Sequence, residues 1–195
     1  MNILTKTCKT PPVDVREVAR YAGCRALTPA VEQTVNICLA EVQPALHNTV
    51  VYAECPVTVQ GGGVDFGAFF VPSTSLIKAL DGCKTAVWFA ATVGLELDRL
   101  ITRYGITAPS KALILQSIGA ERIESLCDTF VDFLSSHTGK TVRPRFSPGY
   151  GDCPLSTQYE VFRLLDCPRK IGLSLNQSLL MSPTKSVTAV VGLEG

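Results

Sequence analysis

Histidine is scarce in this sequence and closely spaced cysteine pairs are missing, and these two shortages argue against the common metal centres. The only histidines are His47 and His137, and none of the eight cysteines stands in a CxxC or CxxxC pair. Structural zinc sites and iron–sulfur clusters need such groups of cysteine and histidine ligands. We therefore expect no metal site in this chain.

Charge of either sign is also sparse. Charged residues make up 18% of the chain, and 18 basic residues against 17 acidic ones leave a net charge of +1. Binding to nucleic acid or to an anionic membrane would need a basic patch or stripe, so neither partner is expected. No uninterrupted apolar run is long enough to span a membrane, and residues 1–12 lack the apolar segment of a signal peptide. We expect a cytoplasmic protein with reduced thiols.

What the chain does contain is enough apolar sequence for one core. With 195 residues, 46% of them hydrophobic, it is predicted to form a single domain over 1–195, with a helical and hairpin part at about 13–105 and a second part at about 110–195. Apolar spacing and turn residues predict helices at 13–22, from Pro29, at 76–80, 95–104, 110–136 and 157–165, and strands at 50–59, 64–71, 85–91 and 186–193. Because no Lys-Ser/Thr follows the triple glycine 61–63, we interpret it as a hairpin turn and not as a phosphate loop. The mixture predicts an α+β fold with a mainly antiparallel sheet.

The segment 143–154 reads RPRFSPGYGDCP and is the strongest candidate for a ligand loop. Three prolines and two glycines in twelve residues fix an irregular path and allow close approach of the backbone to a ligand. Arg145 offers a forked donor for a carboxylate, and Tyr150 offers an aromatic face for a cation or a purine. The composition fits equally a rigid loop with a surface arginine and a packed tyrosine.

Two further groups of polar residues are candidates. Lys185 and Ser186 are expected at the start of the last strand, either as ligand contacts or as turn residues in solvent. Glu121, Glu124 and Asp128 are expected to share one face of the long helix, because they are three and four residues apart. Such a face is either solvated or able to hold a cationic group.

Several runs of this sequence resemble one known family. They are RFSPGYGDCPLSTQ from Arg145, IGLSL from Ile171 and MSPTKSVTAVVGL from Met181, together with REVARYAGCR from Arg16 and AATVGLELD from Ala90. In this order they look like the activation, or reactivation, domain of cobalamin-dependent methionine synthase, and most of all like small stand-alone relatives of that domain.

The resemblance implies a C-shaped α+β domain around a bent antiparallel sheet flanked by helices. It also implies binding of S-adenosylmethionine through an R-x-x-x-G-Y loop, whose positions match Arg145, Ser147, Gly149 and Tyr150. Glu121 or Glu124 would then hold the ligand's α-ammonium group. The implied partner is a cobalamin-binding methionine synthase core, or a related corrinoid protein, that lacks its own activation domain, with a flavodoxin or ferredoxin as electron donor. No catalytic residue is expected, because the sulfonium is already a good leaving group and the protein has only to position it.

This sequence departs from the family pattern in two places. We find no aromatic, aspartate-containing segment near its start, and the loop has Gly151-Asp152 where the family reads closer to Pro-Ala. Asp152 therefore adds a carboxylate that could help or alter ligand binding. Two other functions stay open: a docking module for a corrinoid protein without S-adenosylmethionine, and a self-contained methyltransferase, which the lack of a Rossmann-type glycine motif disfavours.

Overall fold

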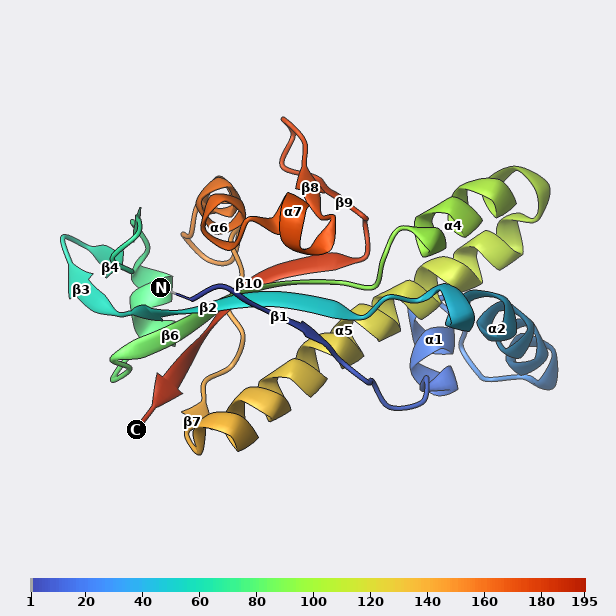
Figure 1. The fold of residues 1–195 in the computed structure, drawn as a ribbon. Helices are drawn as coiled ribbons and strands as arrows, with labels where there is room; N and C mark the ends of the chain where they lie inside the picture. Colours follow the sequence, from blue (N-terminus) through green and yellow to red (C-terminus); the bar gives the residue numbers. More distant parts are fainter. Residues whose placement is uncertain (1) are drawn as a thin grey trace.

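The computed structural model describes residues 2–195 and has a five-stranded sheet at its centre (Figure 1). The strand order is β1-β2-β6-β10-β7, and every neighbouring pair is antiparallel. The strands are β1 Leu4–Thr7, β2 Thr49–Pro56, β6 Thr85–Thr92, β10 Ser186–Glu194 and β7 Thr141–Val142. Strands β6 and β10 are almost wholly buried, as their unbroken apolar and small side chains require.

The longest helix, α5, runs across one face of the sheet, and the other three helices of this layer pack on α5 near one end of the sheet (Figure 1). The four helices are α1 Val15–Tyr21, α2 Pro29–Val42, α4 Glu96–Thr107 and α5 Pro109–Thr138, and a 3-10 turn, η1 Gln43–Ala45, follows α2. Leu115, Ile118, Leu126 and Phe130 of α5 are fully buried against this face, at the spacing of one helix side. Thr28 caps α2 as its sequence predicts, because its Oγ1 accepts a hydrogen bond from the N–H of Val31.

The opposite face carries shorter elements (Figure 1). They pack on a second apolar cluster around Trp88, Phe66 and Leu165. The helices are α3 Thr74–Ala79, α6 Thr157–Leu165 and α7 Cys167–Ile171; the strands are β3 Thr58–Gln60, β4 Gly63–Asp65 and β5 Phe70–Val71 in one small sheet, and β8 Ser174–Leu175 with β9 Met181–Ser182 in another. The central sheet is thus sandwiched between two layers that fold from different parts of the chain.

The structure confirms the α+β class and the antiparallel sheet, and it corrects several boundaries. The strand predicted at 64–71 is two strands, because the chain turns at Gly67, where φ is +78°. A further helix that was not predicted, α7, begins at Cys167, after Asp166 breaks the helical region in the left-handed conformation. The short strands β1, β7, β8 and β9 were not predicted, since strands of two to four residues carry too little pattern.

Three further observations concern residues 2–195. No helix there combines the length and the apolar character needed to cross a bilayer. The same residues contain no group of three or more histidine, cysteine, aspartate or glutamate side chains arranged to hold a metal ion. All eight cysteines are free thiols, and every one except Cys24 is buried.

Candidate ligand-binding site

The loop from Arg143 to Pro154 links β7 to α6 and runs beside the edge of β10. Its backbone pairs with that strand: the N–H of Arg143 donates to the Gly192 carbonyl at 2.9 Å, and Phe146 and Val190 exchange two hydrogen bonds of 2.9 and 2.8 Å. Phe146 packs against the core on the α6 side of the sheet. Because neighbouring residues of an extended chain point to opposite faces, Arg145 is directed toward α5.

Two consecutive turns shape the end of the loop. The N–H of Tyr150 donates to the Ser147 carbonyl at 3.1 Å, and the N–H of Cys153 donates to the Tyr150 carbonyl at 3.0 Å. Gly149 (φ +92°) and Gly151 (φ +55°) lie in the left-handed region, which glycine adopts without a steric penalty. The turns leave Tyr150 59% exposed. Its ring packs edge-on against the ring of Phe146, with the ring centroids 6.0 Å apart.

The side chain of Asp152 anchors this loop to the start of α3. Its carboxylate accepts hydrogen bonds from the hydroxyl of Ser73 (2.5 Å), from the N–H and hydroxyl of Thr74 (2.9 and 2.6 Å) and from the N–H of Ser75 (3.0 Å). The hydrogen bonds from Ser73 and Thr74 hold the pKa of Asp152 well below its usual range. The extra carboxylate of the loop therefore serves the loop's own attachment, and it does not line the cleft described next.

A cleft of about 550 Å³ lies between this loop and the outer face of α5. It is lined by Glu124, Asp128, Val131, Asp132, Val142, Arg143, Pro144, Arg145, Ser147, Tyr150 and Val187. The lining combines a guanidinium group, carboxylates, a hydroxyl and an aromatic ring. Such a set of groups can bind a small ligand that carries charges of both signs and an apolar part.

The guanidinium group of Arg145 forms two ion pairs across the cleft. Its Nη2 lies 2.9 Å from Oε2 of Glu124 and 2.9 Å from Oδ1 of Asp128. Burial lowers the pKa of Arg145, but Cys127, Glu124 and Asp128 raise it by more, so the group stays charged. Burial also raises the pKa of the Cys127 thiol to about 12, which leaves that thiol protonated and inert.

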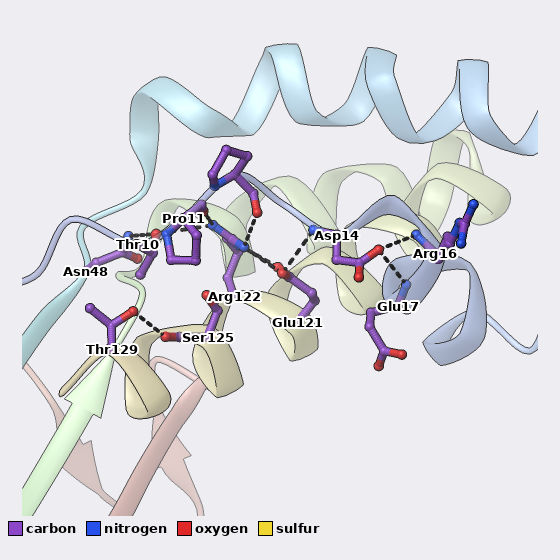
Figure 2. Close-up of polar contacts among 11 residues, drawn as sticks. Thr10, Pro11, Asp14, Arg16, Glu17, Asn48, Glu121, Arg122, Ser125 and Thr129 are labelled. Atoms are coloured by element: carbon purple, nitrogen blue, oxygen red, sulfur yellow. Dashed lines mark hydrogen bonds and ion pairs between the residues drawn. The ribbon is translucent and has the colours of Figure 1, made fainter. Parts of the chain in front are cut away.

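Glu121 lies on the same side of α5 as Glu124 and Asp128, as predicted, but unlike them it is buried. Only 7% of Glu121 is exposed, because the N-terminal segment covers it. Figure 2 shows its carboxylate held by the guanidinium of Arg122, at 2.5 and 2.6 Å, and by the N–H of Asp14 at 3.1 Å. Its oxygens are therefore used within the fold, although the residue borders a second, neighbouring cleft.

Arg122 in turn fastens the N-terminal segment to α5 (Figure 2). It donates to the hydroxyl of Thr10 at 3.1 Å, to the carbonyl of Pro11 at 2.7 Å and to the carbonyl of Pro12 at 3.4 Å. Together with Glu121, these partners satisfy a side chain that is only 3% exposed. The Glu121–Arg122 pair is thus the attachment point of residues 10–14.

Lys185 and Ser186 do not line the cleft around Arg145. The hydroxyl of Ser186 is buried and lies 2.8 Å from the carbonyl oxygen of Pro183 and 2.9 Å from Oγ1 of Thr92. The side chain of Lys185 packs over Gly119 of α5, and burial lowers its pKa. The structure therefore separates these two candidates from the other predicted site residues.

The segment that carries the loop side of the cleft is similar to a known family. A family described as "Vitamin B12 dependent methionine synthase, activation domain" matches residues 132–194, the segment that forms the loop, α6, α7 and β10. This chain resembles that activation domain.

A solved structure supports the resemblance over the whole fold. It is a crystal structure of the MetH reactivation domain bound to AdoHcy, and it superposes with a TM-score of 0.70 at 13% sequence identity. The likeness covers 98% of this chain and 78% of the other. A search of curated protein sequences finds no match. At this identity the structural likeness establishes the activation-domain fold, and the C-terminal match adds the family's sequence pattern.

The segment of this chain that matches the family, residues 132–194, contains Arg145, Ser147, Gly149 and Tyr150. Glu124 lies before this segment. Sequence reasoning did not single out Asp132, which also lines the cleft. Its spacing of four residues from Asp128 on a helix is the signal that could have found it.

The N-terminal segment also comes nearer to the site than expected. Pro11, Glu17 and Tyr21 line the neighbouring cleft, which shares Glu124, Asp128 and Asp132 with the first. This proximity depends on the attachment of residues 10–14 to α5, and the sequence alone does not reveal it.

Proposed function

We propose that this protein binds S-adenosylmethionine in the cleft beside Arg145 and supports reductive methylation of cobalamin on a methionine synthase core that lacks its own activation domain. The observation that carries the proposal is the position of Arg145: it stands in the segment that matches the activation domain and on the wall of the cleft. The solved relative is bound to AdoHcy, the compound that S-adenosylmethionine becomes after losing its methyl group.

The residues of the cleft suit each part of this ligand. Arg145 would pair with the ligand's carboxylate, since a guanidinium has five donors and its present ion pairs use one nitrogen. Glu124 would hold the α-ammonium group, and we assign this role to Glu124 in preference to Glu121, whose carboxylate is occupied by Arg122. The exposed ring of Tyr150 would pack against the sulfonium or the purine, while Ser147 and Gly149 would offer backbone contacts.

The protein's part in the reaction is positioning. S-adenosylmethionine supplies an electrophilic methyl group, and an electron donor of the flavodoxin or ferredoxin type would supply the electron that the partner's cobalamin needs. No general base is required for such a transfer, so the cleft has to orient the ligand and exclude water. The anchoring of the loop by Asp152 favours this role, because it holds Tyr150 in one place before the ligand arrives.

A second function is favoured by one observation. Arg145 is already paired with two carboxylates, which is the arrangement expected if no ligand carboxylate ever enters. The protein would then be a module that docks on a corrinoid protein without binding S-adenosylmethionine.

Calorimetric titration with S-adenosylmethionine separates the two functions. We expect saturable binding by the wild type and at least a ~10-fold weaker affinity for Arg145→Ala, because a hydrogen-bonded charge pair is lost. Arg163→Ala is the matched control, since Arg163 is exposed on α6 and pairs only with its helix neighbour Glu160 among the described residues. Absence of binding by the wild type would contradict the proposal and favour the docking module.

A further inference from the structure

The outer face of α5 presents a row of three carboxylates to the cleft. Glu124, Asp128 and Asp132 are spaced by four residues, so they lie along one side of the helix, and all three line the cleft. Glu124 and Asp128 are paired with Arg145. Asp132 has no hydrogen bond or ion pair with any residue in the range 2–195, and its side chain is exposed.

This arrangement leaves the cleft with an excess of negative charge. The charged groups of its lining are the three carboxylates and the guanidinium groups of Arg143 and Arg145. Arg143 is itself paired with Glu194, 2.5 Å away, which is not part of the lining. Among the described residues that line the cleft, Arg145 is therefore the one cation available to a ligand, and it faces two carboxylates. A ligand that brought only a carboxylate would meet net repulsion, whereas a ligand with net positive charge would be attracted.

The two forms of the proposed ligand differ in this property. S-adenosylmethionine carries a carboxylate, an ammonium and a sulfonium, so its net charge near pH 7 is +1. When the methyl group leaves, the electron pair of the carbon–sulfur bond stays on sulfur, and the resulting thioether S-adenosylhomocysteine is neutral overall. An unpaired carboxylate beside the ligand therefore distinguishes the form that carries the methyl group from the form that has lost it.

We propose that Asp132 is a specificity-determining residue that makes the cleft hold the sulfonium form more tightly than the thioether. The inference rests on the proposed function and adds to it the charge selection of the ligand. After transfer of the methyl group, the affinity of the cleft for the S-adenosylhomocysteine that is left is therefore lower, which favours its exchange for another S-adenosylmethionine. The effect is moderate and salt-dependent, because Asp132 lies at the surface, where solvent and ions screen it.

The test compares the affinities of the two compounds for three proteins by calorimetry at low and high ionic strength. For the wild type at low salt we expect S-adenosylmethionine to bind several-fold more tightly than S-adenosylhomocysteine. Asp132→Asn should weaken S-adenosylmethionine by about three- to fivefold and leave S-adenosylhomocysteine within twofold of the wild type. The control Glu32→Gln removes one negative charge from the exposed face of α2, outside the cleft, and should change neither value.

The outcomes separate this inference from the proposed function. Equal affinity of the wild type for both compounds, or an affinity ratio unchanged in Asp132→Asn, would overturn the charge selection and leave the ligand site in place. A ratio that falls equally in Glu32→Gln would show a general effect of net charge and would overturn it too. A wild type that binds neither compound would overturn both proposals together.

Discussion

The buried ion pair between Glu121 and Arg122 yields the sharpest prediction about stability. Replacing Arg122 by alanine removes a guanidinium that donates to Glu121, Thr10, Pro11 and Pro12, all within 3.4 Å. It leaves the Glu121 carboxylate buried with the N–H of Asp14 as its remaining partner. The substitution therefore creates an uncompensated buried charge and also releases the N-terminal segment from α5.

The expected magnitude follows from this geometry. Removing one partner of a buried ion pair costs about 3–5 kcal/mol, because the other charge stays desolvated. With a urea dependence of about 2–3 kcal/mol per molar for a domain of this size, the midpoint of unfolding should fall by roughly 1–2 M. Arg20→Ala is the matched control. Arg20 pairs with Glu17 on the surface of α1, where solvent screens the pair, so its loss should leave the unfolding midpoint nearly unchanged.

Urea unfolding followed by far-UV circular dichroism measures both variants, and hydrogen exchange reports whether residues 10–14 lose protection in Arg122→Ala. A midpoint for Arg122→Ala no lower than that of Arg20→Ala would refute the reasoning. It would mean that Glu121 is readily neutralised or solvated when Arg122 is absent. Glu121 would then be restored as a candidate for the ligand's ammonium group.

Two other predictions concern the loop. Gly151→Ala would place a Cβ 2.4 Å from the hydroxyl oxygen of Ser75. It should therefore lower the free energy of unfolding by about 1–3 kcal/mol more than Gly62→Ala, because Gly62 also has a positive φ but has open space around it. Equal losses of stability in urea unfolding would contradict this. Because the folded-state pKa of Asp152 is depressed, its contribution to stability is present above the unfolded pKa of about 3.9 and is lost as the pH falls through and below that value. The melting temperature of the wild type should therefore fall more steeply than that of Asp152→Asn between pH 5 and pH 3, and parallel curves would show that the hydrogen bonds to α3 do not lower this pKa.

Much of the fold could be predicted from the sequence where local signals are strong. Helix α6 has the predicted bounds, 157–165, and the long helix and the last strand were placed to within two residues. These segments have clear apolar spacing and definite end signals, which do not depend on the rest of the chain. The irregular segment at 143–154 was also predicted, because its prolines and glycines exclude regular structure whatever surrounds it.

The separation of Glu121 from Glu124 could not be predicted in this way. The two residues lie within one arc of α5, so helical spacing treats them alike. What distinguishes them is the N-terminal segment, more than a hundred positions away, which covers one and leaves the other exposed. Lys185 and Ser186 failed to join the site for a related reason, although the next residue, Val187, lines the cleft. The Lys185 side chain packs over Gly119 of α5, and the Ser186 hydroxyl is directed to Thr92 and Pro183, contacts that come from distant parts of the chain or from the turn before β10.

The position of Asp152 bears on the proposed function. As a departure from the family pattern, it suggested a new contact to the ligand, yet the structure places its carboxylate on the first residues of α3, 77 to 79 positions earlier in the chain. Under the proposed function, orienting a reactive methyl group would gain more from a fixed loop than from another charge in the cleft. In the proposed site, the charge that would act on a ligand comes from α5, where Asp132 stands unpaired among the described residues, and the loop is held in place by α3. Contacts with α3 fix the loop, whereas the carboxylates on the other wall of the cleft come from α5. Substitutions at Ser73 or Thr74 should therefore change the orientation of a bound ligand without removing a contact to it.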